Sequence, residues 1–167
     1  MMSASDTTDD QKSHLPITVT ASGFRDNDWL DRRHVALSDL ESVAASDMAG
    51  LAEIVIGIHG DDTVETVRSW LPHIAAVEIY FDTAHDGRGF SLARRLTEMG
   101  FQGEIRAAGA LHVDQFPHAI QCGIYALNLS RQAALRMPEQ YWIDTAATIA
   151  TEQSYQSRLM PISKSAS

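Results

Sequence analysis

Apolar residues along this chain gather in short runs between polar turns, and their spacing changes repeatedly from strand-like to helix-like. Ile54, Val55 and Ile56 are adjacent, which is typical of a strand covered on both faces. Leu92, Leu96 and Met99 recur every three or four residues, as on one face of a helix. Runs of the two kinds alternate four times after residue 50, which predicts about four βα units.

The same runs give the expected boundaries of the regular elements. They predict strands at Leu51–Ile58, Val77–Phe81, Glu104–Ala108 and Ala126–Leu129, with a short first strand at Ile17–Val19. Helical spacing, capping residues and glycine or proline stops predict helices at Thr63–Leu71, Ser91–Met99, Val113–Gln121 and Gln132–Ile149, the last broken or restarted at Pro138.

The segment between the first two strands has a weaker pattern. Phe24–Asp31 has the composition of a polar turn with a lone Trp29. Ser38 and Glu41 match a capping box, which predicts either a weak helix or a loop around Leu40–Ala45.

Alternating strands and helices with short connections predict an α/β fold with parallel strands and right-handed crossovers. Two architectures fit about four such units: an open doubly wound sheet, or a half-barrel resembling part of a TIM-type barrel. In either, the strand ends near Phe81 and Ala108 meet at one rim, where ligands usually bind. We expect one domain over residues 16–160, between a disordered tail at 1–15 and a loose C-terminus at 161–167.

Charge and composition narrow the possible partners. The net charge is -9, from 13 basic and 22 acidic residues, which argues against a nucleic-acid partner. No apolar run approaches the roughly 20 residues of a membrane span, and the acidic start Met1–Lys12 lacks a signal-peptide pattern. We therefore expect a cytoplasmic protein without a membrane partner, and the sequence leaves its oligomeric state open.

The chain has one cysteine, Cys122, in an apolar context. One thiol cannot hold an iron–sulfur cluster or a structural zinc ion, and a buried, inert side chain is the expected role. Asp61 and Asp62 follow the strand where a flavin phosphate would sit and would repel it. We expect no bound cofactor and no metal.

Residues able to carry chemistry are densest in Asp82–Ser91, after a predicted strand and at the start of a helix. A helix N-terminus presents free N–H groups and partial positive charge, and Arg88 adds a planar donor fork. Gly87 and Gly89 permit backbone conformations that other residues avoid. The segment predicts either a site for a small oxyanion or a tight turn in which Arg88 pairs with Asp82 or Asp86.

The stretch Asp86–Leu96, Asp-Gly-Arg-Gly-Phe-Ser-Leu-Ala-Arg-Arg-Leu, resembles the signature of the bacterial domain-of-unknown-function 934 family. The resemblance continues through Gly103–Gly109, Asp114–Phe116 and Cys122-Gly123, and it covers about Ala76 to Leu129. It implies an accessory protein of assimilatory sulfite reduction, with a sulfite reductase or another sulfur-assimilation enzyme as partner. It also implies an alternative, an oxidoreductase acting on a small sulfur oxyanion; a small-anion binding module without catalysis is a third possibility.

The resemblance establishes no catalytic residue, so the site is predicted only as an anion site. Its candidate residues are Asp86, Gly87, Arg88, Gly89, Ser91, Arg94, Arg106, Asp114 and Gln115. Arg88 and Arg106 belong to successive predicted βα units, so we expect both side chains to approach the same rim, within reach of one anion. The chain departs from the family pattern at Ala110, Val113, Gln121 and Tyr125, which removes two polar partners expected on the second rim loop.

Overall fold

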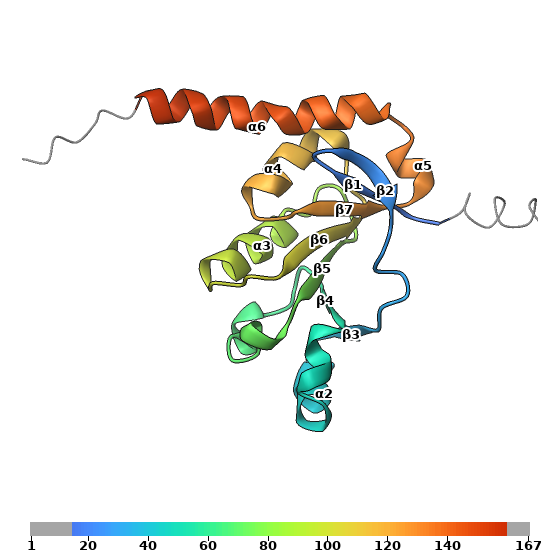
Figure 1. Ribbon diagram of the computed structural model, residues 1–167, viewed down its shortest axis with the longest axis vertical. Coiled ribbons are helices and arrows are strands. Elements are labelled where there is room, and N and C mark those ends of the chain that lie inside the picture. The colour runs from blue at the N-terminus through green and yellow to red at the C-terminus, as the bar shows by residue number, and fades with distance from the viewer. Residues whose placement is uncertain (1–14, 160–167) are drawn as a thin grey trace, which may run out of the picture.

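The five strands between residues 34 and 129 lie side by side in chain order. In residues 15–159, which the computed structural model describes, one seven-stranded sheet has the order β2-β1-β7-β6-β5-β4-β3 (Figure 1). The strands are β1 Ile17–Thr20, β2 Gly23–Asp26, β3 His34–Ala36, β4 Val55–Ile58, β5 Ala76–Phe81, β6 Glu104–Gly109 and β7 Ala126–Leu129. Strands β3 to β7 are parallel, whereas β1 is antiparallel to both β7 and β2.

The sheet confirms a mixed α/β fold with mostly parallel strands. From β3 to β7 the order runs without the reversal that defines a switch point in a doubly wound sheet. The antiparallel pair β1–β2 at the other end belongs to neither predicted architecture. Its strands were partly missed because β2 falls within the stretch whose composition suggested a polar turn.

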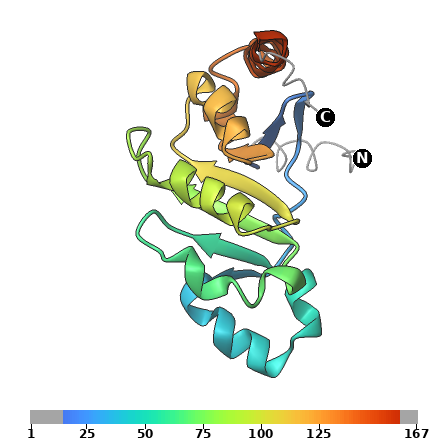
Figure 2. The same cartoon turned by 90° about the vertical axis from the view of Figure 1, so that its left-hand side faces the viewer.

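The helices pack on one face of the sheet. They are α2 Leu40–Ser46, α3 Arg88–Glu98, α4 Phe116–Gln121, α5 Arg131–Ala134 and α6 Glu139–Leu159. Figure 2 shows α3 and α4 lying over this face. Side chains from α2 to α6 share one core with the strand residues Val77, Ile79 and Leu127, so this face is the apolar one. Within residues 15–159, no helix combines the length and the apolar character needed to cross a membrane.

Several expected helices are shorter than predicted. Thr63–Leu71 contains two 3-10 turns, Val64–Val67 and Leu71–His73, because β-branched residues and Pro72 disfavour a continuous helix. Val113–Gln121 divides into a 3-10 turn, Val113–Gln115, and α4. Four βα units with full helices are therefore not found.

At the other helices, the proline signal predicted a boundary correctly and the capping-box signal did not. Two further 3-10 turns, Leu37–Asp39 and Ala49–Ala52, flank α2. The helix α2 forms where a weak helix or a loop was expected, but no side chain caps its N-terminus, so the predicted capping box is absent. The restart at Pro138 is confirmed, since α5 ends at Ala134 and α6 begins at Glu139. The expected tail and C-terminus fall almost wholly on residues 1–14 and 160–167, outside the described residues.

Residues 27–33, which we call the strap, run across the face of the sheet opposite the helices. The strap connects β2 and β3, which lie at opposite edges of the sheet (Figure 1). Trp29 of the strap forms a small separate cluster with Val55 and Ala76 on this face. Because strand side chains alternate, the same face also carries Glu78, Arg106 and Asn128.

Candidate functional site

The turn before α3 is closed by its own ion pair. Asp86 Oδ1 accepts hydrogen bonds from the backbone N–H of Arg88 (3.1 Å) and from its Nε (2.9 Å), and Oδ2 accepts one from Nη2 (2.7 Å). The side-chain hydrogen bond from Arg88 is the main cause that lowers the pKa of Asp86 to about 2. The turn thus has the geometry of the second alternative, and an external anion at Arg88 would compete with Asp86.

The two glycines of this turn matter for the absence of a side chain rather than for an unusual backbone conformation. Neither Gly87 nor Gly89 has a positive φ angle, so the expected special conformations are absent. A Cβ atom at Gly89 would lie 2.4 Å from Cζ of Phe81, whereas one at Gly87 would meet nothing within 4 Å. Gly89 therefore lets the first turn of α3 rest on the Phe81 ring, and Gly87 leaves the helix start open.

Gln115 joins the two rim loops that follow β5 and β6. Its Nε2 donates a hydrogen bond to the carbonyl of Ala84 (2.7 Å), and its Oε1 accepts one from the backbone N–H of His112 (2.9 Å). Asp114, its neighbour in the same 3-10 turn, is exposed. Gln115 therefore has a positioning role, and Asp114 adds negative charge at the rim.

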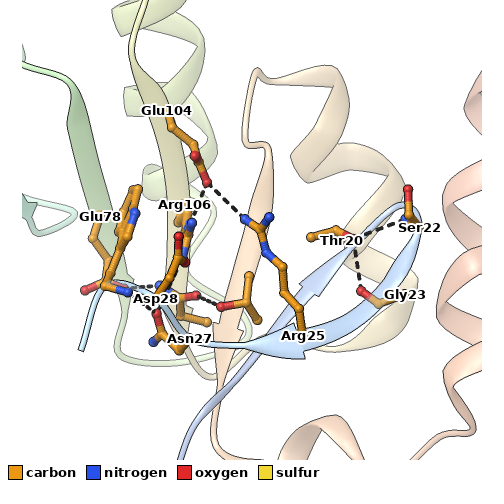
Figure 3. A network of polar contacts seen from close by, with 12 residues as sticks. Thr20, Ser22, Gly23, Arg25, Asn27, Asp28, Glu78, Glu104 and Arg106 are labelled. Atoms are coloured by element: carbon orange, nitrogen blue, oxygen red, sulfur yellow. Dashed lines mark hydrogen bonds and ion pairs between the residues drawn. The ribbon is translucent and has the colours of Figure 1, made fainter. Parts of the chain in front are cut away.

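Arg106 lies apart from the turn, under the strap. It is the strand partner of Glu78 in β5 and is fully buried, with Nε donating to Glu104 (2.6 Å) and Nη1 to Asp28 (2.7 Å) (Figure 3). Arg106 is 0% exposed within β6, whereas Arg88 is 62% exposed at the start of α3, so the structure does not bring the two guanidinium groups together at one rim. The expectation failed because Arg106 is the third residue of β6, well before the carboxyl end of that strand.

A pocket of about 490 Å³ lies between α3 and the end of α4. It is lined by Gly87, Phe90, Ser91, Arg94, Arg95, Glu98, His118 and Cys122. Three of the predicted anion-site residues are among them: Gly87, Ser91 and Arg94. The candidate site is therefore this pocket along α3 rather than the turn in front of the helix.

The three arginines of the signature segment differ in their partners. Arg88 is paired with Asp86, and Arg95 donates from Nε to Glu65. Arg94 forms no ion pair with a carboxylate of residues 15–149, the part of the chain whose side chains are described, and its Nη2 instead lies 3.8 Å from Sγ of Cys122. Arg94 is thus the cation of this segment that remains available to a ligand.

Cys122 is buried, as predicted, but it has polar neighbours that were not foreseen. The residue is 3% exposed, and its Sγ lies 3.7 Å from Nε2 of His118. His118 stands four residues earlier, one helical turn away, and that spacing was visible in the sequence. The contact with Arg94 joins residues 28 positions apart and follows only from the packing of α3 on α4.

The comparison with protein families decides the relationship. A family model described as "Bacterial protein of unknown function (DUF934)" matches residues 55–160. The chain belongs to the DUF934 family. Among curated proteins and among solved structures, no match was found.

The DUF934 match covers the pocket but not the strap. It begins at Val55, the first residue of β4, and includes α3, α4 and every residue that lines the pocket. Asp28 and Trp29, which cover Arg106, stand before it. Of the four departures from the family pattern, Ala110, Gln121 and Tyr125 are exposed and Val113 is buried, and none of them lines the pocket.

Proposed function

We propose that this DUF934 protein is an accessory protein of assimilatory sulfite reduction and that it binds a small oxyanion in the pocket between α3 and α4. The sulfur role comes from the sequence resemblance. The anion site rests on one observation, the Arg94 guanidinium that faces this pocket without a carboxylate partner in the described residues.

The position of the pocket along α3 favours an anion at one end. Gly87 and Ser91 belong to the start of this 11-residue helix, where the helix dipole is positive. Glu98 lies seven residues after Ser91, which is about 10 Å further along the helix axis. An anion held by Arg94 would therefore sit nearer the helix start than the Glu98 carboxylate.

Thermal unfolding in the presence of sulfite tests the site. If sulfite binds with a dissociation constant near 1 mM, 10 mM ligand stabilises the fold by about 1.4 kcal/mol, or a rise in Tm of roughly 3 to 6 °C. The shift should persist in Arg88→Gln, because Asp86 already occupies that guanidinium, and disappear in Arg94→Gln. Chloride at matched ionic strength controls for screening.

Arg136→Gln is the matched control. Arg136 is exposed, lies outside the pocket and forms no ion pair with the described side chains of residues 15–149, so its loss changes net charge equally without touching the site. Equal shifts for Arg94→Gln and Arg136→Gln would contradict the proposed site, as would a shift that is lost in Arg88→Gln.

The accessory role has its own test. A purified sulfite reductase should bind the immobilised protein at micromolar concentration, and the purified protein alone should reduce no sulfite. Failure of this binding, together with sulfite-dependent stabilisation, would leave an anion-binding module without that partner.

The Cys122 thiol favours a second candidate, an oxidoreductase acting on a small sulfur oxyanion. Its Sγ lies within 4 Å of both Arg94 and His118, and Cys122 lines the same pocket, so the thiol stands beside the proposed anion. Turnover of sulfite that Cys122→Ser abolishes, or a flavin or haem absorbance band at stoichiometric amplitude, would favour this candidate over the accessory role.

A further inference from the structure

Arg106 is a fully buried cation whose hydrogen bonding is incomplete. Its Nε and Nη1 have carboxylate partners, but Nη2 has no acceptor among residues 15–149, whose side chains the structure describes. Buried donors are nearly always paired, and guanidinium groups favour two parallel hydrogen bonds to one carboxylate. Asp28 uses only one of its oxygens, at Nη1, and so leaves the adjacent position on the guanidinium open.

The groups around Arg106 differ in how firmly they belong to the sheet. Glu104 stands on the same strand, two residues earlier, and holds Nε. Glu78 of β5 is held separately by Asn128, whose Nδ2 donates to it at 2.6 Å. The Glu104 contact with Nε therefore comes from the sheet itself and does not depend on the strap.

The contacts from above all come from the strap. Asp28 and Asn27 accept hydrogen bonds from Nη1 (Figure 3). The Trp29 ring lies over the guanidinium, 3.9 Å from Cζ to the ring centroid. The Asp28 side chain is 62% exposed although its partner is 0% exposed. Water therefore reaches the anion of this pair and weakens its hold on Arg106.

We propose that the strap is a displaceable cover over a carboxylate-binding site and that Asp28 occupies this site as an internal stand-in for a ligand carboxylate. A ligand carboxylate in place of Asp28 bridges Nη1 and Nη2 of Arg106 and supplies the missing acceptor. The Trp29 ring moves with the strap and exposes the cation.

The charges at the site select a monoanion. Glu104 and Glu78 balance Arg106 and Arg25, whose Nη2 lies 3.6 Å from Glu104, when the imidazole of His34, 3.4 Å from Glu78, is neutral. Once Asp28 has left, the site has no net charge and accepts one negative charge in its place. A doubly charged sulfate would be repelled by the two remaining carboxylates, and the guanidinium excludes a metal cation. The ligand is therefore a carboxylate, free or on the side chain of an acidic peptide.

Asp28→Asn tests the stand-in because it keeps the shape of the strap and removes the internal carboxylate. Acetate is titrated at constant ionic strength, and the Nε–H signal of Arg106 is followed by nitrogen-15 NMR. We expect a saturable shift in Asp28→Asn at concentrations at least ten times lower than in the wild type. Asp31→Asn is the matched control, because Asp31 is also an exposed strap residue but forms no ion pair in the described residues.

Two further experiments identify the source of the carboxylate and the role of the Arg106 guanidinium. An acetylated and amidated Gly-Asp-Gly peptide that binds Asp28→Asn ten times more tightly than acetate supports a peptide ligand, and equal binding supports a free carboxylate. Arg106→Lys removes the guanidinium fork, so the saturable acetate-dependent shift should disappear. Because the Arg106 Nε–H signal is then absent, this variant is followed on the Ala107 amide. Binding in Asp28→Asn no tighter than in Asp31→Asn, or sulfate binding as well as acetate, would overturn the proposal. Sulfite stabilisation through Arg94 is unaffected by either result.

Discussion

Replacing Gly89 by alanine probes how α3 is seated on the sheet. The added Cβ would lie 2.4 Å from Cζ and 2.8 Å from both Cε atoms of Phe81, closer than real contacts allow. The Phe81 ring is 3% exposed and packs against Phe90 with centroids 4.8 Å apart, so it has little room to withdraw. Either the ring or the helix start must shift.

The expected cost follows from two opposing terms. Overpacking of a filled core costs about 1 to 3 kcal/mol. Alanine in place of glycine returns about 0.5 to 1 kcal/mol through helix propensity and a less flexible unfolded chain. We therefore expect Gly89→Ala to lower the free energy of unfolding by about 1 to 2 kcal/mol. At a urea slope near 2 kcal/mol per molar, the midpoint falls by about 0.5 to 1 M.

Gly87→Ala is the matched control two residues away. The added Cβ meets nothing within 4 Å and the φ angle of -76° suits alanine, so its urea midpoint should stay within about 0.3 M of the wild type. Phe81→Leu in the Gly89→Ala background should recover part of the loss by removing the ring atoms in contact. Gly89→Ala as stable as Gly87→Ala would refute the packing argument.

Three further changes test other contacts. Asp86 has a folded-state pKa of about 2, below its ordinary 3.8, so its ionised form stabilises the fold above pH 4 and this stabilisation is lost as the pH falls from about 4 to 2. In urea unfolding, Asp86→Asn should lack that part of the acid-dependent loss of stability. Identical pH profiles for the variant and the wild type would contradict this. Gln115→Ala removes the hydrogen bond to Ala84 and should cost about 1 kcal/mol in urea unfolding, with faster amide exchange in both rim loops. Trp29→Ala should cost about 3 kcal/mol and Trp29→Phe clearly less, because phenylalanine keeps a ring over Arg106; equal losses would mean that the ring contact is unimportant.

The hydrophobic pattern was sufficient for the parallel strands β5, β6 and β7 and for the place of α3, whereas β4 begins at Val55, four residues after its expected start. Continuous apolar runs identify buried strands well, and β5, β6 and β7 lie within a residue of their expected bounds. The pattern failed at β2 and β3, because these edge strands are short and polar and gain their stability from pairing. It also overestimated the helix at Thr63–Leu71, where local β-branched residues outweigh helical spacing.

The candidate site was only partly predicted, because local sequence signals do not show which residues pair across long separations. A turn rich in glycine and arginine pointed to the start of α3, but sequence spacing could not tell which arginine keeps a carboxylate partner. Asp86 and Glu65 neutralise Arg88 and Arg95, and the second of these pairs joins residues 30 positions apart. The burial of Arg106 under Trp29 joins residues still further apart and depends on the path of the strap.

Isothermal titration of sulfite into the wild type, Arg94→Gln and Arg88→Gln tests the central claim, that Arg94 binds an oxyanion in the α3–α4 pocket. The wild type and Arg88→Gln should bind one sulfite per chain with similar affinity, because the Arg88 guanidinium is already paired with Asp86. Arg94→Gln should bind at least ten times more weakly. Equal binding by Arg94→Gln and the wild type, or loss of binding in Arg88→Gln alone, would contradict the account.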